Sequence, residues 1–171
     1  MKKLNIMAFA VLALTAASAR VSAQETASAT ATATIVTPIS IVKDVDMNFG
    51  NVAVQSTTGG TVVLTPAGVR SRTGGVTLPT TATGTITAAS FTVTGTGNYT
   101  YAITLPSTAL TITSGANTMT VTNFTSTPSG VGTLTAGTQT LTVGATLNVS
   151  AAQPAGTYVS GTPFDVTVNY N

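Results

Sequence analysis

The stretch SFTVTGTGNYTYAITL, at residues 90–105, decides the fold, because apolar and polar residues alternate on both sides of a glycine-containing break. Phe91 and Val93 share one face of the first run. The second run places four apolar residues on one face: Tyr99, Tyr101, Ile103 and Leu105. A period of two residues is that of a β-strand with one buried face. The stretch therefore predicts two short strands.

The same alternation recurs after residue 23, and helical periodicity is missing there. Further strands are predicted at Ile39 to Phe49, Thr61 to Leu64, Met119 to Phe124, Thr138 to Val149 and Pro163 to Tyr170. Turn residues such as Gly59-Gly60 and Pro128-Ser129-Gly130 separate them. Thr-rich tracts also occur in disordered, glycosylated stalks, but large apolar residues at strand spacing favour an ordered fold. Short strands divided by turns are typical of an all-β sandwich or barrel.

The N-terminus has the pattern of a secretory signal peptide. Lys2 and Lys3 form a basic start, Leu4 to Ala17 is apolar, and Val21-Ser22-Ala23 supplies small residues for cleavage. The apolar run is too short for a membrane anchor. A retained amphipathic anchor is the alternative interpretation.

This pattern predicts three parts of the chain. Residues 1–23 are expected to form a cleaved signal helix, residues 24–38 an extended N-terminal segment, and residues 39–171 a single β-sandwich domain. The protein is then expected to be exported to the periplasm, the cell surface or the extracellular space. No membrane span is expected after signal cleavage.

The predicted mature chain has few groups capable of catalysis. It contains no His, Cys or Trp, and its one Lys is isolated, so no activated nucleophile or base is evident. Seven charged side chains give it a formal net charge of −1, namely Lys43, Arg70, Arg72, Glu25, Asp44, Asp46 and Asp165. This balance argues against nucleic-acid binding, and a disulfide framework is excluded. We expect a non-enzymatic protein with no cofactor, no metal and no nucleic-acid partner.

Two polar features need an interpretation. Asp44, Asp46 and Asn48 form a D-x-D-x-N series, but a calcium loop also needs a Gly directly after the third ligand and a Glu at its twelfth position. The chain has neither, so the three residues are assigned to the solvent face of a strand. Arg70 and Arg72 are interpreted as parts of an exposed, solvated loop, with a grip on a carboxylate or sugar as the alternative.

Strand edges are the predicted place of function. Exposed edges recruit other chains unless charges, Pro or bulges protect them, and the run from Met119 to Val149 contains no charge. Such edges are expected to pair, within the subunit or with a strand donated by another copy. The segment before Pro38 is a candidate donor, because it is free of charge between Thr26 and Val42. The candidate pairing residues are Ala29, Ala31, Ala33 and Ile35 in this segment, and Phe164, Val166, Val168 and Tyr170 in the C-terminal strand.

Several motifs together carry a resemblance to a known family. They are VDMNFG at 45–50, FTVTG at 91–95, LTVGATLNV at 141–149, AGTY at 155–158 and VTVNY at 166–170. As a set they resemble the DUF4402 family of exported bacterial proteins, whose function is unknown. The pattern is similar, more distantly, to spore coat U and chaperone–usher pilin subunits. This wider resemblance implies an antiparallel, immunoglobulin-like (Greek-key) β-sandwich that assembles into surface fibres by donated strands.

Two departures from the pilin pattern bear on assembly. Pilin donors usually present bulky apolar residues, whereas Ala29, Ala31 and Ala33 are small, and the disulfide of many pilins has no counterpart here. Residues 27–36 are thus open to two interpretations, donation to another copy or completion of their own domain.

The expected function is that of a structural subunit of a bacterial surface fibre, pilus-like polymer or coat. Its partners would be further copies of itself or other fibre subunits. The alternative is a monomeric secreted or periplasmic adhesin or carbohydrate-binding module, which needs a cluster of exposed aromatic residues. A hydrolase would require two carboxylates that converge in a cleft.

Overall fold

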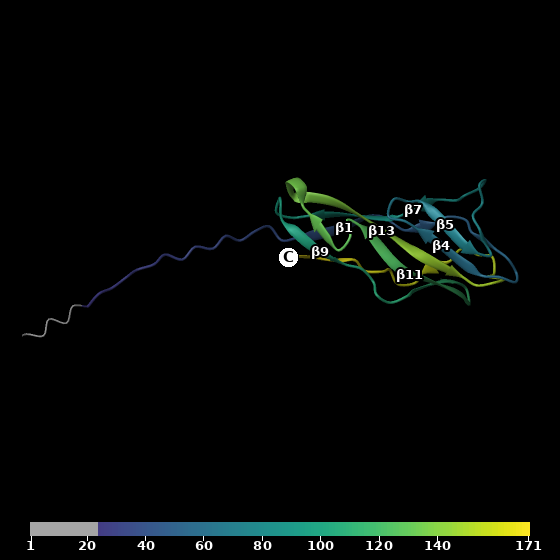
Figure 1. The fold of residues 1–171 in the computed structure, drawn as a ribbon. Helices are drawn as coiled ribbons and strands as arrows, with labels where there is room; N and C mark the ends of the chain where they lie inside the picture. The colour runs from purple at the N-terminus through teal and green to yellow at the C-terminus, as the bar shows by residue number, and fades with distance from the viewer. Residues whose placement is uncertain (1–23) are drawn as a thin grey trace, which may run out of the picture. The chain divides into compact units, whose positions relative to one another are not determined.

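The computed structural model describes residues 24–171. The signal helix predicted at residues 1–23 lies outside the described residues. The chain divides into two units, Met1–Thr34 and Ile35–Asn171, and all the described strands belong to the second unit (Figure 1). Within residues 24–171, no helix combines the length and apolarity that crossing a membrane requires.

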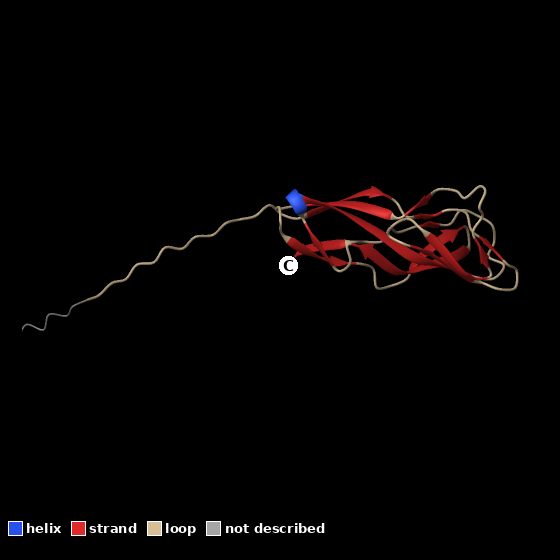
Figure 2. Ribbon diagram, turned by 45° about the horizontal axis from the view of Figure 1, so that its top comes forward, coloured by secondary structure: helices blue, strands red, loops and turns tan. Residues whose placement is uncertain are grey.

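The second unit consists of short and medium-length strands joined by turns, with one 3-10 turn (Figure 2). Every pairing between these strands is antiparallel. In chain order the elements are β1 (Ser40–Val45), β2 (Asn48–Phe49), β3 (Ala53–Val54), β4 (Gly60–Leu64), β5 (Arg70–Gly74), β6 (Val76–Thr77), β7 (Ile86–Thr87), β8 (Ala89–Thr94), β9 (Thr100–Thr104), β10 (Leu110–Ser114), β11 (Asn117–Thr127), β12 (Val131–Thr133), η1 (Thr135–Gly137), β13 (Thr138–Val149), β14 (Val159–Ser160) and β15 (Thr167–Tyr170).

The larger sheet is organised around β13. Its order is β1-β8-β13-β11-β10-β14, with β4 also paired to β13 and β5 paired to β4. On one side, β13 pairs with β8 through Val143 and then with β4 from Ala145 onward. Gly144 stands at this change of partner, where a Cβ would collide with the backbone of Leu64 and Thr65. The missing side chain lets β4 approach β13 closely.

The smaller sheet has the order β12-β9-β15 and packs against the first half of the larger one. Fully buried residues from both sheets meet between the layers, among them Val93 on β8, Tyr101 on β9 and Leu141 on β13. Alternate residues along each strand point inward, as the period of two requires. The predicted all-β antiparallel sandwich is therefore confirmed.

The stretch at residues 90–105 crosses between the two layers. Its first run forms β8 in the larger sheet, and its second run forms β9 in the smaller sheet. The two apolar faces therefore do not lie side by side in one sheet. They face each other across the core, where Phe91 and Val93 pack in the same cluster as Tyr101 and Ile103.

A second core cluster fills the other end of the large sheet. Val62, Val121 and Leu147 are buried in it. Residues of the two-stranded sheets β2–β7 and β3–β6, such as Phe49 and Val76, pack against or within it. The two clusters share Met47 and Phe124 on their borders, so the core is continuous along the sandwich.

Five predicted strands agree with β4, β8, β9, β11 and β13, and β13 has the predicted bounds. The single strand predicted from Ile39 to Phe49 is wrong, because the register shifts between Lys43 and Val45 and the run divides into β1 and β2. The strand predicted from Pro163 begins only at Thr167. The β9–β15 register would place Asp165 opposite Pro106, and a proline cannot donate a ladder hydrogen bond.

The N-terminal segment behaves differently from the domain. Despite their alternation, residues 24–34 belong to no strand, and all of them are exposed. Ile35, in the second unit, is 97% exposed. Alanine side chains bury little apolar area, so the alternation of Ala and Thr alone gives this segment little reason to pack.

Candidate strand-pairing edges

Five strands of the described domain pair on one side only. They are β1, β5 and β14 in the larger sheet and β12 and β15 in the smaller one. An unpaired edge presents N–H and C=O groups to any strand that can reach it. We call an edge guarded where charged side chains or a bulge interrupt it, and open where it has neither.

The edge at β5 is guarded by two arginines. Arg70 donates through Nη1 to the carbonyl oxygens of Phe49 and Asn51, and Arg72 donates through Nη1 to that of Val76 at 2.8 Å. These bonds satisfy carbonyl groups of neighbouring short strands and turns. The prediction of a solvated loop at Arg70 and Arg72 is therefore wrong.

A sequence signal for this guard exists. Arg70-Ser71-Arg72-Thr73 alternates with a period of two and follows the strand Thr61 to Leu64 across a short turn. Arg72 pairs in register with Val62, and Arg70 with Leu64, both of which face the core. The arginines therefore point to the inner side of the sheet, where the unpaired carbonyls lie.

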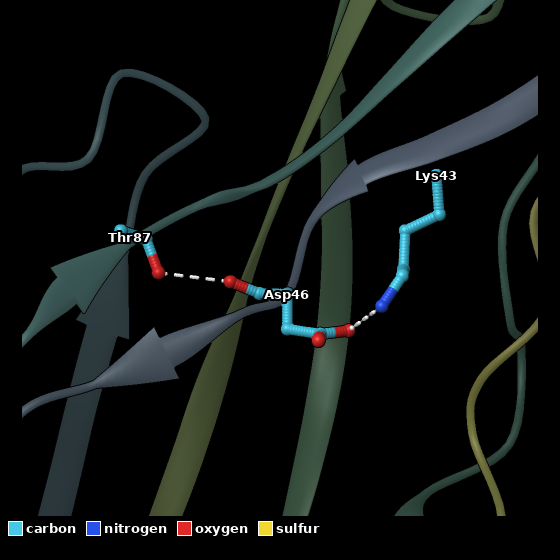
Figure 3. Close-up of polar contacts among 3 residues, drawn as sticks. All are labelled: Lys43, Asp46 and Thr87. Atoms are coloured by element: carbon cyan, nitrogen blue, oxygen red, sulfur yellow. Dashed lines mark hydrogen bonds and ion pairs between the residues drawn. The ribbon is translucent and has the colours of Figure 1, made fainter.

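The far half of β1 is guarded as well. A bulge lies between Lys43 and Val45, and Lys43 pairs with Asp46 at 2.7 Å (Figure 3). Thr87 donates to the Asp46 carbonyl oxygen at 2.8 Å in the same place. Both charged side chains are more than half exposed, so the pair contributes about 0–1 kcal/mol to stability. Its main effect is to put charge on this edge.

The three residues of the D-x-D-x-N series have separate partners. Asp46 binds Lys43, Asp44 accepts a hydrogen bond from Thr92 at 2.9 Å, and Asn48 accepts one from the Gly50 N–H at 2.8 Å. Within residues 24–171, no three His, Cys, Asp or Glu side chains gather closely enough to hold a metal ion.

The edge at β15 is open. It carries no charged residue, and it lies next to β1 without being paired to it. The Asn171 N–H donates to the Thr100 carbonyl. Since hydrogen-bonding directions alternate along an antiparallel strand, Val168 and Tyr170 direct their backbone groups away from β9, toward the free edge. Yet Val168 is only 8% exposed.

The predicted pairing residues of the C-terminal strand face inward. Phe164, Val166, Val168 and Tyr170 all belong to the main core cluster or pack against it. Phe164 contacts the rings of Phe91 and Phe124, with centroid distances of 6.4 and 5.0 Å. Their side chains thus serve their own domain, and the part of β15 that faces outward is its backbone. Ala29, Ala31, Ala33 and Ile35 are exposed.

Strand β9 holds β15 in place and rests on Tyr101. The Tyr101 ring lies over Gly132, where a Cβ would collide with it. Its hydroxyl donates to Gln139 Oε1 at 2.8 Å, and the same oxygen accepts the Thr133 N–H at 2.9 Å. Burial raises the pKa of the Tyr101 phenol, because the charged form loses its hydration there.

A shallow cavity of about 370 Å³ lies where the β9–β10 loop meets the segment before β15. Leu105, Pro106 and Phe164 line it, and Asp165 is the ionisable residue in its wall. Asp44 and Asp46 do not line it. The paired carboxylates that a glycoside hydrolase uses are therefore not brought together at this cavity.

The edge geometry and the fold can now be compared with known proteins. A family model described as a domain of unknown function, DUF4402, matches residues 39–170. The chain belongs to the DUF4402 family. No curated protein and no solved structure matches it. The DUF4402 match covers both sheets and both core clusters, and it begins after the N-terminal segment.

Proposed function

We propose that this DUF4402 protein is an exported, non-enzymatic structural subunit that assembles by β-strand pairing between copies, into a surface fibre, pilus-like polymer or coat. The observation that supports the proposal best is the open edge of β15. Val168 is shielded from water, but among the described residues no strand pairs with the edge its backbone faces. An unpaired buried backbone group costs about 1–3 kcal/mol. A strand added there would recover this free energy.

Residues 24–36 of a second copy are the proposed occupant of this edge. They are exposed apart from the half-buried Val36, and they have no charge after Glu25. Because β1 and β15 lie close to each other, a strand entering between them needs small side chains on its inner face. Ala29, Ala31 and Ala33 meet this requirement, and Ile35 adds one larger apolar contact.

Deletion of residues 24–36 from the full gene tests the proposal. Protein purified after export should form fibres or large assemblies when the segment is present and should be monomeric without it. Electron microscopy and light scattering after gel filtration measure the difference. Fibres of normal stability from the deletion variant would refute the donor role, and an intact chain that stays monomeric at all concentrations would refute the function.

A matched pair of substitutions tests the proposed face of the donor. Ala31→Asp puts a charge on the face that would be buried and should raise the concentration needed for assembly at least roughly tenfold, because a buried unpaired carboxylate is costly. Thr32→Asp adds the same charge on the opposite face and should have a much smaller effect. Equal effects of the two substitutions would contradict the proposed face.

The carbohydrate-binding alternative has one observation in its favour. Tyr99 is 44% exposed and packs against Tyr170 with ring centroids 5.6 Å apart and an angle of 63° between the rings. Aromatic side chains that remain exposed suit sugar rings, but an edge-to-face pair does not form a flat platform. A glycan screen with a clear hit that Tyr99→Ala abolishes, on a protein that stays monomeric, would favour this alternative.

A further inference from the structure

The hydroxyl of Tyr170 joins two segments that are far apart in the sequence. It donates a hydrogen bond to the Thr37 carbonyl oxygen at 2.8 Å and accepts one from the Thr96 N–H at 2.7 Å. The Thr37 N–H in turn donates to Thr96 Oγ1 at 2.9 Å. Thr37, Thr96 and Tyr170 thus form a closed ring of hydrogen bonds, here called the Tyr170 cluster.

The space for the Tyr170 hydroxyl is made by two neighbours. Gly95 lies so close that a Cβ at this position would collide with the hydroxyl. Tyr99 packs edge-to-face against the Tyr170 ring. The ring therefore has a defined position, since it is packed on its side and its hydroxyl has both a donor and an acceptor.

The cluster stands at the boundary between the N-terminal segment and the sandwich. Two residues before Thr37, Ile35 is 97% exposed. Directly after it, Pro38 has a fixed φ and restricts Thr37 to extended conformations. The backbone is thus restricted at residues 37 and 38 by proline, and it is bonded to the domain only through Thr37.

We propose that the Tyr170 cluster is the anchor that fixes the start of the N-terminal segment to β15 and to the β8–β9 turn. Tyr170 is a positioning residue in this arrangement, because it acts through the backbone of Thr37. If the proposed function holds, the anchor ties a subunit's donor segment to its own acceptor strand. In a fibre it would limit the angle between neighbouring subunits. The anchoring itself does not depend on assembly.

Hydrogen exchange of the Thr37 and Thr96 amides tests the anchor. In Tyr170→Phe, protein purified after export should exchange both amides roughly tenfold faster than the wild type, because their protection depends on the cluster. Tyr158→Phe is the matched control. It removes a hydroxyl that donates to the Pro154 carbonyl and accepts from Gln153 Nε2, both at 2.8 Å, outside the cluster. This control should leave the two amides unchanged.

A second variant separates the anchor from general loosening of the domain. Thr96→Val removes the Oγ1 that accepts the Thr37 N–H but keeps the Thr96 N–H bonded to Tyr170. It should accelerate exchange at Thr37 and leave Thr96 protected. Unchanged exchange at Thr37 in Tyr170→Phe, or equal acceleration in Tyr158→Phe, would overturn the proposal. These measurements need no assembly, so loss of the proposed function would leave their result valid.

Discussion

Strands β5 and β15 lie at the edges of different sheets, and the chain treats them in opposite ways. At β5, Arg70 and Arg72 donate to the carbonyl oxygens of Phe49, Asn51 and Val76. At β15, no charged residue stands on the strand, and its free edge faces β1 without pairing. A protein with so few charges has placed two of them where association would be unproductive. The contrast indicates that the open edge is the one reserved for pairing.

The largest expected effect comes from removing the guard at β5. Replacing Arg70 and Arg72 by Met leaves three carbonyl groups without a donor, and each substitution should lower the free energy of unfolding by about 1–3 kcal/mol. Urea denaturation measures this loss. The double variant should also associate in a way that persists after deletion of residues 24–36. Wild-type stability and a clean monomer in that deletion background would show that the arginines are not guards.

A smaller effect should follow when a guard is transferred to the open edge. Asn169 is exposed on β15, and Asn169→Lys should raise the concentration needed for assembly roughly tenfold, because an edge lysine disfavours strand addition. Thr133→Lys places the same charge on β12, the other edge of this sheet, and should not affect assembly. If both variants assemble like the wild type, the acceptor is not β15.

The smallest expected effect concerns the strand that supports the open edge. Tyr101→Phe should lower the free energy of unfolding by about 0.5–1.5 kcal/mol at neutral pH, through loss of the bond to Gln139. Burial raises the folded-state pKa of Tyr101 above its ordinary value of 10.0. The associated stability is therefore present below pH 10 and is lost as the pH rises through the folded-state pKa.

Denaturation between neutral pH and the alkaline range measures this dependence. Tyr101→Phe should lack this part of the alkaline loss, whereas Tyr99→Phe, at an exposed position, should retain it. An identical alkaline profile for Tyr101→Phe and the wild type would contradict the assignment to Tyr101.

The sequence predicted strands best where large apolar residues alternate with polar ones. This holds for β8, β9 and β13, whose inward residues include Phe91, Tyr101 and Leu141. Strands such as β12 and β14 escaped prediction because Thr, Ser and Gly give little contrast between two faces. In residues 27–36 the same alternation predicted a strand that the structure does not contain.

The candidate site was predicted only in part. The inward face of the C-terminal strand is visible from the spacing of Phe164, Val166 and Val168. Which edges stay unpaired depends on contacts between distant segments, such as β13 with β4. A single sequence does not contain that register. The arginines of β5 were misassigned for the same reason, because their carbonyl partners lie on other strands.

The double pairing of β13 has a consequence for how the chain reaches its native state. One side of this strand needs β8 and β4, and the other needs β11, so the sheet has no complete centre until residues 138–149 have been synthesised. Pairings of such large sequence separation form slowly, on a scale of roughly milliseconds to seconds. During that interval the earlier strands have no permanent neighbours, and aggregation competes with correct pairing. A chain of this design would benefit from a chaperone that covers its strands until β13 arrives.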